Sequence, residues 1–400
     1  MKFKIEPKSL ADTVAWVVQN YDAKDSQSYV ALTVEKDTGK ASLTHVNRAS
    51  HMKAPLAITE LSFEEVESED SYSIPLDGPY LKNLAAVVKR MGIDELTFSK
   101  NLTKKNDPLK LKGDKQNFTV PVLMIETQKT PKLTVLGETT DLDFLGALQK
   151  LAKLCTLASA DAGAATGAVA IHLGEKKLTL MGTDSYSLGE IILDYSPNQE
   201  NLEQFVEKSA NESIILVPRT AALTVKPSRV PTDMIELVYD SKSKKFGYSF
   251  DDGRIALFSL DQSTPTIYEA LKNSVVEAST CYVDLELHDL TRAIEAIVSL
   301  SPEEVDVNIH IFGGKKKKKF SVSDTKKTNV IELEVDSMNF EGELNVSLFR
   351  DVISKSLVPL SPGTIRVLFA GENSQMVVLR KLKEDNKIDK NIFSLAVIAT

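Results

Sequence analysis

The chain has 400 residues, of which 42% are hydrophobic and 26% are charged, and its formal net charge is −8. This length predicts two to four domains with sizeable cores, and the charged fraction is typical of a globular protein. The acidic balance argues against a protein coated in nucleic acid, although it permits a local basic surface. With no apolar run long enough to span a membrane and no signal-peptide layout at the N-terminus, we expect an unprocessed, cytoplasmic protein.

One pattern recurs six times along the chain: a short alternating stretch, a polar turn residue and an amphipathic helix of about twelve residues. The six repeats begin at Phe3, Tyr72, Leu133, Ser213, Cys281 and Glu343, and the fourth has the shortest helix. Between the helices, short runs rich in Val, Ile, Leu and Phe predict strands at 43–58, 95–100, 118–125, 168–173, 177–185, 234–240, 245–250, 254–260, 364–370 and 375–382. The sequence therefore predicts an α+β fold built from six strand–helix–strand repeats.

The composition changes near 127–133 and near 271–280, which predicts domain borders there. The three predicted domains span 1–128, 129–272 and 273–400, with two repeats in each. Three further stretches are predicted to be loops: Pro197–Glu212, Gly313–Thr328 and Lys381–Asn391. The run Lys315–Lys319 in the second of them is interpreted as a solvated hairpin tip, and a contact with DNA phosphates is the alternative.

Basic residues are concentrated in the predicted helices, although acids outnumber bases 56 to 48 in the whole chain. The helices contain eleven basic residues, namely Lys8, Lys82, Lys89, Arg90, Lys150, Lys153, Arg219, Lys226, Arg292, Arg350 and Lys355, against three acidic ones, Asp12, Glu295 and Asp351. A single lysine of this kind would indicate only a solvated helix face. Because the bias recurs in repeat after repeat, it predicts a surface that binds double-stranded DNA through its phosphates, without reading the sequence.

The size of the predicted domains fits a ring around such a duplex. A domain of ~130 residues is about 35 Å wide, and six such bodies in a closed ring leave a hole of roughly 35 Å. A duplex of about 20 Å would pass through it. Three domains per chain then require a homodimer.

The sequence contains none of the common catalytic, metal-binding or nucleotide-binding motifs. There is no phosphate-cradling loop, HExxH, CxxC or GxSxG, and the five histidines lack metal-ligand spacing. Cys155 and Cys281 lie in apolar stretches and are interpreted as free thiols. Asp184 has no neighbouring His or Glu, so we interpret it as the cap of a tight turn. We expect no enzyme activity, no catalytic residue, no metal and no cofactor, since a hydrolase would need an acid/base cluster.

Five segments stand in a characteristic order: MKFKIEPKSL, KLTLMGTDSYSLGE, SIILVPRTAALTV, FSLDQSTPTIYEAL and ELNVSLFRDVI. In this order they resemble the bacterial-type DNA polymerase III beta subunit, the DNA sliding clamp, in a divergent or phage-encoded form. The resemblance covers nearly the whole chain. It implies three similar clamp domains that close into a ring as a head-to-tail dimer, with the helices lining the hole.

The resemblance also implies a cleft, between the second and third domains, for short hydrophobic peptide motifs of partner proteins. Carried over position by position, the cleft comprises Thr183, Ser185, Tyr186, Ser187, Leu188, Pro265, Tyr268, Leu271, Asn345, Leu348, Val397 and Ile398. Lys24 lies in a loop where the family often has a basic DNA contact, so it joins the predicted DNA-binding residues. Two positions depart from the family: Ser187 replaces its usual Arg, and the chain lacks its usual Met-Pro-apolar-Arg-Leu ending.

The predicted function is therefore that of a polymerase processivity factor. Such a clamp encircles duplex DNA and tethers DNA polymerase and other replication and repair proteins. A clamp-loader ATPase is an expected partner, because this chain has no nucleotide site. The cytoplasm, of the host for a phage protein, is the expected location. The alternative is a peptide-binding scaffold that does not act on DNA, which would explain the cleft but not the basic helices.

Overall fold

The computed structural model describes residues 1–19, 28–63, 71–102, 104, 107–127, 131–139, 144–156, 166–208, 214–224, 234–260, 269–314, 317–370 and 376–397. The contacts within the chain divide it into two compact units. Unit 1 comprises Met1–Leu142, Asn198–Leu202 and Thr224–Leu260, and unit 2 comprises Asp143–Pro197, Glu203–Leu223 and Asp261–Thr400. The three-domain division stays a prediction.

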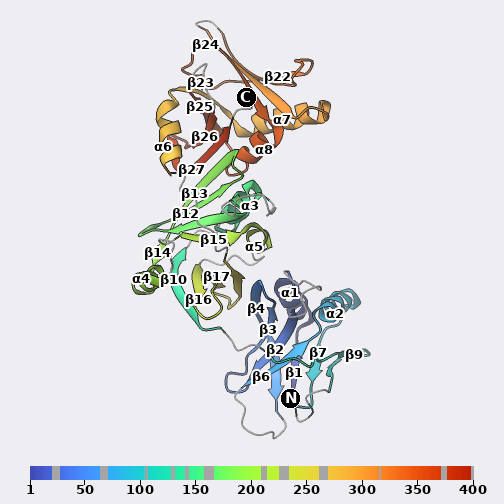
Figure 1. Ribbon diagram of the computed structural model, residues 1–400. Coiled ribbons are helices and arrows are strands. Elements are labelled where there is room, and N and C mark those ends of the chain that lie inside the picture. Colours follow the sequence, from blue (N-terminus) through green and yellow to red (C-terminus); the bar gives the residue numbers. More distant parts are fainter. Residues whose placement is uncertain are drawn as a thin grey trace. The chain divides into compact units, whose positions relative to one another are not determined.

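Unit 1 is built on two antiparallel sheets (Figure 1). The smaller sheet has the order β5 (Ile58–Ser62), β1 (Lys2–Ile5), β7 (Leu96–Ser99), β8 (Leu109–Lys112) and β9 (Asn117–Val120). The strands of the larger sheet that belong to unit 1 have the order β10 (Leu133–Thr139), β16 (Ile235–Asp240), β17 (Lys245–Phe250), β18 (Ile255–Ser259), β4 (Ser50–Leu56), β3 (Ala41–Val46), β2 (Tyr29–Glu35) and β6 (Ser71–Leu76). In its middle β18 pairs with β4, so strands distant in the sequence complete one sheet.

Two helices of unit 1, α1 (Pro7–Val17) and α2 (Gly78–Met91), pack against each other. Proline suits the first turn of α1 because the backbone N–H that it lacks would have no partner within the helix. At the start of α2, the Asp77 carboxylate accepts a hydrogen bond of 2.7 Å from the backbone N–H of Tyr80. Gly92 ends α2 in the left-handed conformation, with φ +60°. Local signals thus define both ends of α2.

Unit 2 also contains two antiparallel sheets. The nine-stranded sheet has the order β15 (Ile214–Pro218), β11 (Ala168–Leu173), β12 (Lys177–Thr183), β13 (Ser187–Asp194), β27 (Ile388–Val397), β26 (Met376–Leu382), β25 (Thr364–Phe369), β19 (Cys281–Glu286) and β23 (Ser337–Met338). The four-stranded sheet has the order β22 (Val330–Leu333), β21 (Lys318–Ser323), β20 (Asp306–Gly313) and β24 (Gly342–Phe349). The remaining elements of the chain are α3 (Phe144–Leu154), β14 (Ser196–Pro197), α4 (Gln199–Lys208), α5 (Arg219–Thr224), α6 (Glu269–Ala278), α7 (Leu287–Leu300) and α8 (Arg350–Leu357).

The centre of the nine-stranded sheet joins β13 to β27, from Ser187 opposite Ala396 to Ile191 opposite Ile392. Figure 1 shows β13, in green, beside β27, in red. Helix α3 lies close to β12 and β13 because Gly182 and Gly189, which face each other across the hairpin, have no side chains. A Cβ on Gly182 would lie 2.5 Å from the Leu151 carbonyl oxygen, which no side chain could tolerate.

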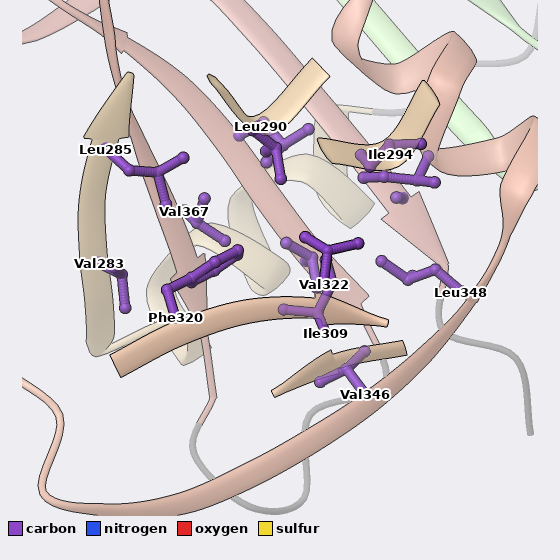
Figure 2. Close-up of a cluster of buried hydrophobic side chains, with 14 of the residues drawn as sticks. Val283, Leu285, Leu290, Ile294, Ile309, Phe320, Val322, Val346, Leu348 and Val367 are labelled. Atoms are coloured by element: carbon purple, nitrogen blue, oxygen red, sulfur yellow. The ribbon is translucent and has the colours of Figure 1, made fainter. Parts of the chain in front are cut away.

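The largest core described in unit 2 lies around α7 and α8, between the two sheets. Figure 2 shows side chains from both sheets and from α7 meeting there. They include Val283, Leu285, Leu290, Ile294, Ile309, Phe320, Val322, Val346, Leu348 and Val367. Burial of this many apolar side chains fixes the two helices on the sheets.

The helices of the six repeats are confirmed as α1, α2, α3, α5, α7 and α8, and the fourth, α5, is the shortest of them. Two of the predicted loops are largely wrong. Pro197–Glu212 contains α4, which Asn198 caps and which buries Leu202 and Phe205. Lys381–Asn391 is mostly the end of β26 and the start of β27, joined by a tight turn.

The third predicted loop, Gly313–Thr328, includes the hairpin between β20 and β21, and Lys315 and Lys316 at its tip lie outside the described residues. Beyond the tip, Lys319 of β21 is ion-paired with Glu332 of β22.

The domain border predicted near 271–280 coincides largely with α6. None of the helices described is long and apolar enough to cross a membrane.

Candidate functional site

The hairpin of β12 and β13 ends in a tight turn that presents one aromatic side chain to solvent. Backbone N–H of Asp184 donates to the carbonyl oxygen of Ser187 over 3.2 Å. Between them, Ser185 is in the left-handed region with φ +78°, which costs a residue with a side chain about 1 kcal/mol. Tyr186 is 55% exposed. The hydrogen bonds within the turn offset the strain at Ser185.

Asp184 organises the turn from inside. Its Oδ1 accepts hydrogen bonds from the backbone N–H of Tyr186 (3.1 Å) and of Ser187 (2.8 Å), and from the Ser187 hydroxyl (2.7 Å). Its Oδ2 accepts from Lys355 Nζ at 2.7 Å. Burial alone would raise the pKa of this carboxyl, but the hydrogen bonds from Lys355 and Ser187 outweigh it and hold the pKa below its ordinary value. The predicted role as a turn cap is confirmed.

The other polar side chains of the turn are also engaged within it. The Thr183 hydroxyl donates to the Ser187 carbonyl oxygen at 2.7 Å and accepts from the Ser185 backbone N–H at 3.1 Å. Both Thr183 and Ser187 are buried. Ser187, where the family resemblance would place Arg, therefore serves the turn itself rather than a ligand.

Tyr186 lies against a second exposed aromatic side chain. Its ring meets that of Phe349 edge-on, with 6.4 Å between centroids, and Phe349 is 38% exposed. The Tyr186 carbonyl oxygen also accepts from the Val397 backbone N–H at 2.9 Å. The family resemblance predicts Leu348 as a cleft residue and does not indicate Phe349. Because neighbouring residues of a strand point to opposite faces, Leu348 enters the core while Phe349 faces outward.

The remaining predicted cleft residues differ from Tyr186 in exposure, and some of them lie outside the described residues. Leu188 is buried against Leu395, and α6 covers this face of the sheet with Val275. An ion pair of 2.8 Å between Lys272 of α6 and Glu190 of β13 also holds that helix. Asn345 is exposed on β24 and Val397 is half-buried. The described residues do not include Pro265, Tyr268 and Ile398, and nothing is described of the Leu271 side chain.

The predicted DNA-binding residues differ in exposure. Those that are exposed are Lys82, Lys89, Arg90, Lys153 and Arg292, and Lys150 is half-buried. Lys24 and Lys226 lie outside the described residues. Helix α2 bears three of the exposed cations, Lys82, Lys89 and Arg90, the last two in its final turn, where they also complement the helix dipole.

Three of the predicted cations bind other groups of the protein. Arg219 Nε donates to the Ala152 carbonyl oxygen near the end of α3, at 3.0 Å. Arg350 Nη1 donates to the carbonyl oxygens of Pro302 (3.0 Å) and Glu304 (3.3 Å), which follow α7. Lys355 is paired with Asp184. Each of these residues therefore stabilises contacts between elements.

The basic bias belongs to the helices of the repeats. Asp289, in the first turn of α7, adds a fourth acidic residue to the three predicted in the helices of the repeats. The two other helices are rich in glutamate, with Glu200 and Glu203 in α4 and Glu277 in α6. Their acidic character leaves the cations concentrated on the repeat helices.

The described residues contain no group of three or more His, Cys, Asp or Glu side chains that could hold a metal ion. Cys155 and Cys281 are free, and burial raises the pKa of the Cys155 thiol to about 11. At neutral pH that thiol is protonated and so a poor nucleophile. The geometry instead offers a pair of exposed aromatic rings, Tyr186 on the turn and Phe349 at the end of β24, together with helices bearing exposed cations.

The fold is that of the DNA sliding clamps. Along its whole length the chain is similar to solved structures of DNA polymerase III beta-subunit clamps, so the predicted α+β clamp fold is confirmed, while the ring and the dimer stay predictions. The Bacillus subtilis DNA polymerase sliding clamp is 14% identical, with a TM-score of 0.76 over 100% of this chain and 99% of that chain. The beta subunit from Pseudomonas aeruginosa is also 14% identical, with a TM-score of 0.75 over 100% of both chains.

A third similar structure is the Helicobacter pylori beta clamp bound to a DNA ligase peptide. It is 14% identical, with a TM-score of 0.70 over 100% of this chain and 99% of that chain. No protein-family model and no curated protein matches the sequence. The likeness is therefore one of three-dimensional structure, with a widely diverged sequence.

Proposed function

We propose that this protein is a DNA sliding clamp, a processivity factor that encircles duplex DNA and tethers DNA polymerase and other replication or repair proteins. The observation that supports this most strongly is the likeness to beta-subunit clamps over the full length of both chains. A scaffold unrelated to DNA would not need helices whose exposed side chains are so often basic. The proposed clamp performs no chemistry of its own.

Sequence-independent contact with DNA is assigned to the exposed cations of the repeat helices, chiefly Lys82, Lys89, Arg90, Lys153 and Arg292. Lysine and arginine bind phosphates by charge, which suits a protein that has to slide. Lys24, Lys150 and Lys226 belong to the same proposal. Arg219, Arg350 and Lys355 contribute to it chiefly through the electrostatic field of their charges, because each already donates a hydrogen bond to a protein group.

Partner binding is assigned to the surface around Tyr186 and Phe349. Ser185 of the turn, Val397, which donates to the Tyr186 carbonyl oxygen, and Asn345 of β24 belong to the same proposal. Exposed aromatic side chains on a rigid support are efficient anchors for short peptides. The Helicobacter pylori clamp in complex with a ligase peptide gives a precedent for a clamp that binds a peptide. Thr183, Ser187, Leu188 and Leu348 would support this surface from beneath, and Pro265, Tyr268, Leu271 and Ile398 complete the proposed cleft.

A closed ring needs two copies of the chain, for which we propose a head-to-tail homodimer of three-domain subunits, acting in the cytoplasm where replicating DNA lies. A clamp-loader ATPase of the same organism would open it.

The decisive experiment is topological. The protein is loaded on nicked circular DNA by the clamp loader of its source organism, and the circle is then cut once. A ring should remain on the circle and slide off the linear form, and blocking both ends with bound streptavidin should restore retention. Equal retention on circular and unblocked linear DNA would contradict the proposal and favour ordinary DNA binding.

A further inference from the structure

Helix α8 contacts the Tyr186 turn at two points. Phe349, the residue that precedes its first turn, lies edge-on against the Tyr186 ring. Lys355, in its last turn, places Nζ 2.7 Å from Asp184 Oδ2. One contact is with the exposed side chain of the turn and the other is with the carboxylate that organises its backbone.

The helix that makes these contacts is itself firmly fixed. The hydroxyl of Ser356, the residue after Lys355, lies 2.8 Å from the Val352 carbonyl oxygen of its own helix and 3.0 Å from the Leu395 carbonyl oxygen of β27, and shares its one hydrogen between them. The Ser394 hydroxyl donates back to the Ser356 carbonyl oxygen at 2.6 Å. Both serines are fully buried. Since β27 also pairs with β13, Lys355 extends from an element held on the same sheet as the turn.

The Lys355–Asp184 pair differs from an ordinary surface ion pair. The Lys355 side chain is 37% exposed, but that of Asp184 is only 5% exposed. Oδ1 of Asp184 is occupied by three donors within the turn, and Lys355 binds the other oxygen. Without the ammonium group, this oxygen would be left in a mostly buried place lacking that donor, and the carboxylate could reorient at the expense of the turn.

We propose that Lys355 is a positioning residue for partner binding: its ion pair with Asp184 fixes the turn that presents Tyr186 to an apolar peptide. This inference rests on the proposed peptide-binding function. It assigns Lys355, which its place on a basic helix suggested as a DNA contact, to the partner site instead. It also gives α8 a role in that site, although the helix lies more than 160 residues after the turn in the sequence.

Two variants separate the ammonium group from the rest of the side chain. Lys355→Met keeps an unbranched apolar side chain in the helix and removes the charge, whereas Lys355→Arg keeps a charged donor. The matched control is Lys326→Met, at an exposed lysine between β21 and β22. Two properties of the full-length protein are measured: hydrogen exchange over residues 183–188 without peptide, and the affinity for the fluorescein-labelled DNA ligase peptide of the Helicobacter pylori complex.

In Lys355→Met, we expect the amides of Tyr186 and Ser187 to exchange about tenfold faster and the peptide to bind about fivefold more weakly, a loss moderated by the partial exposure of the pair. Lys355→Arg should keep most of the exchange protection and most of the peptide affinity, and Lys326→Met should change neither property. Unchanged exchange in Lys355→Met would overturn the inference. Weaker peptide binding with unchanged exchange would overturn it too, because Lys355 would then contact the peptide directly.

Variants of Asp184 test whether faster exchange in Lys355→Met comes from loss of the ion pair rather than from a general loss of folding. Asp184→Asn keeps an oxygen acceptor for the turn and removes the charge that binds Lys355, so it should speed exchange similarly. In the double variant, Lys355→Met should then add little to the exchange rate of Asp184→Asn, because the effects of substitutions at two coupled residues are not additive. Full additivity would overturn the inference. If the unaltered protein fails to bind the peptide, the peptide part of the proposed function fails, while the exchange data still decide the role of Lys355.

Discussion

At the scale of single residues, the candidate site depends on a polar network that leaves one aromatic ring outside. The hydroxyls of Thr183 and Ser187 and the carboxylate of Asp184 are bound within the turn or to Lys355. The largest exposed side chains left for a partner are the rings of Tyr186 and Phe349. Recognition at this turn should therefore depend on apolar contact more than on hydrogen bonding.

Tyr186→Ala tests that expectation. Loss of the anchor ring should weaken binding of the labelled ligase peptide by about tenfold or more, as for other buried aromatic anchors in interfaces. Thermal stability should hardly change, because the side chain is mostly exposed. The control is Tyr80→Ala on α2, which removes another exposed tyrosine far from the turn in sequence. Equal peptide affinity for Tyr186→Ala and the control would rule out Tyr186 as an anchor. Fluorescence anisotropy gives the affinities.

The Asp184 carboxyl should leave a signature in the pH dependence of stability. Its pKa in the folded protein is lowered, so the folded state favours the ionised form relative to the unfolded chain. The stabilisation is therefore complete above the unfolded pKa of about 3.9 and is lost as the pH falls through the lower folded pKa. The difference in unfolding free energy between the unaltered protein and Asp184→Asn should be constant from about pH 5 to 8 and shrink below about pH 4. A difference that grows on acidification would contradict this.

Sequence reasoning reached some of these residues and missed others for physical reasons. Asp184 could be identified as a turn cap because its bonds are local, two and three residues along the chain. Helical spacing predicts Lys355 as a DNA contact because it reveals a basic face but not the group opposite that face, and the partner of Lys355 is 171 residues away. The sequence does not indicate Phe349, because the choice between it and Leu348 depends on which face of β24 is buried.

At the scale of elements, the helices of the six repeats followed from periodicity, whereas α4 and α6 did not. The repeat helices combine a buried stripe with a polar face, as in α2, where Leu81, Leu84, Ala85 and Val88 are buried. Helix α4 is polar overall and buries only a few side chains, so its composition resembled that of a loop. Strand pairing such as β13 with β27 could not be predicted, since register depends on tertiary contacts.

Helix α2 is the element best suited to a test of DNA contact. Replacing Lys82, Lys89 and Arg90 by Gln should reduce the slope of log K against log salt concentration by about 2 to 3, near one unit per lost phosphate contact. The matched control replaces Lys110, Lys112 and Lys115, which are exposed around β8 of the same unit. Both triple variants lose the same charge, so equal slopes would show that net charge matters rather than the face of α2. Binding to a short duplex is measured by anisotropy over a range of salt concentrations.

At the scale of the whole molecule, the central prediction is a dimer of this 44.0 kDa chain. Among the described residues, the outer strands of the smaller sheets, β5 and β9 in unit 1 and β22 and β24 in unit 2, pair on one side only, so their other edges could hydrogen-bond to a second copy. Light scattering at micromolar concentration should give twice the mass of the chain. A stable monomer throughout that range would count against the closed ring. Bovine serum albumin of known mass serves as the calibration control.

The pairing of β4 with β18 has a consequence for how the protein is made. Phe258 lies opposite Ser50, so about 200 residues must be synthesised after β4 before its partner exists. At typical translation rates of 5–20 residues per second, β4 waits roughly 10 to 40 seconds with one edge open. During this interval the nascent chain presents an unsatisfied strand beside a hydrophobic sheet, an arrangement prone to pairing with other chains. Slow ribosomes or a premature stop before β18 would therefore turn the N-terminal half into a source of aggregates, and chaperone protection is needed most in that interval.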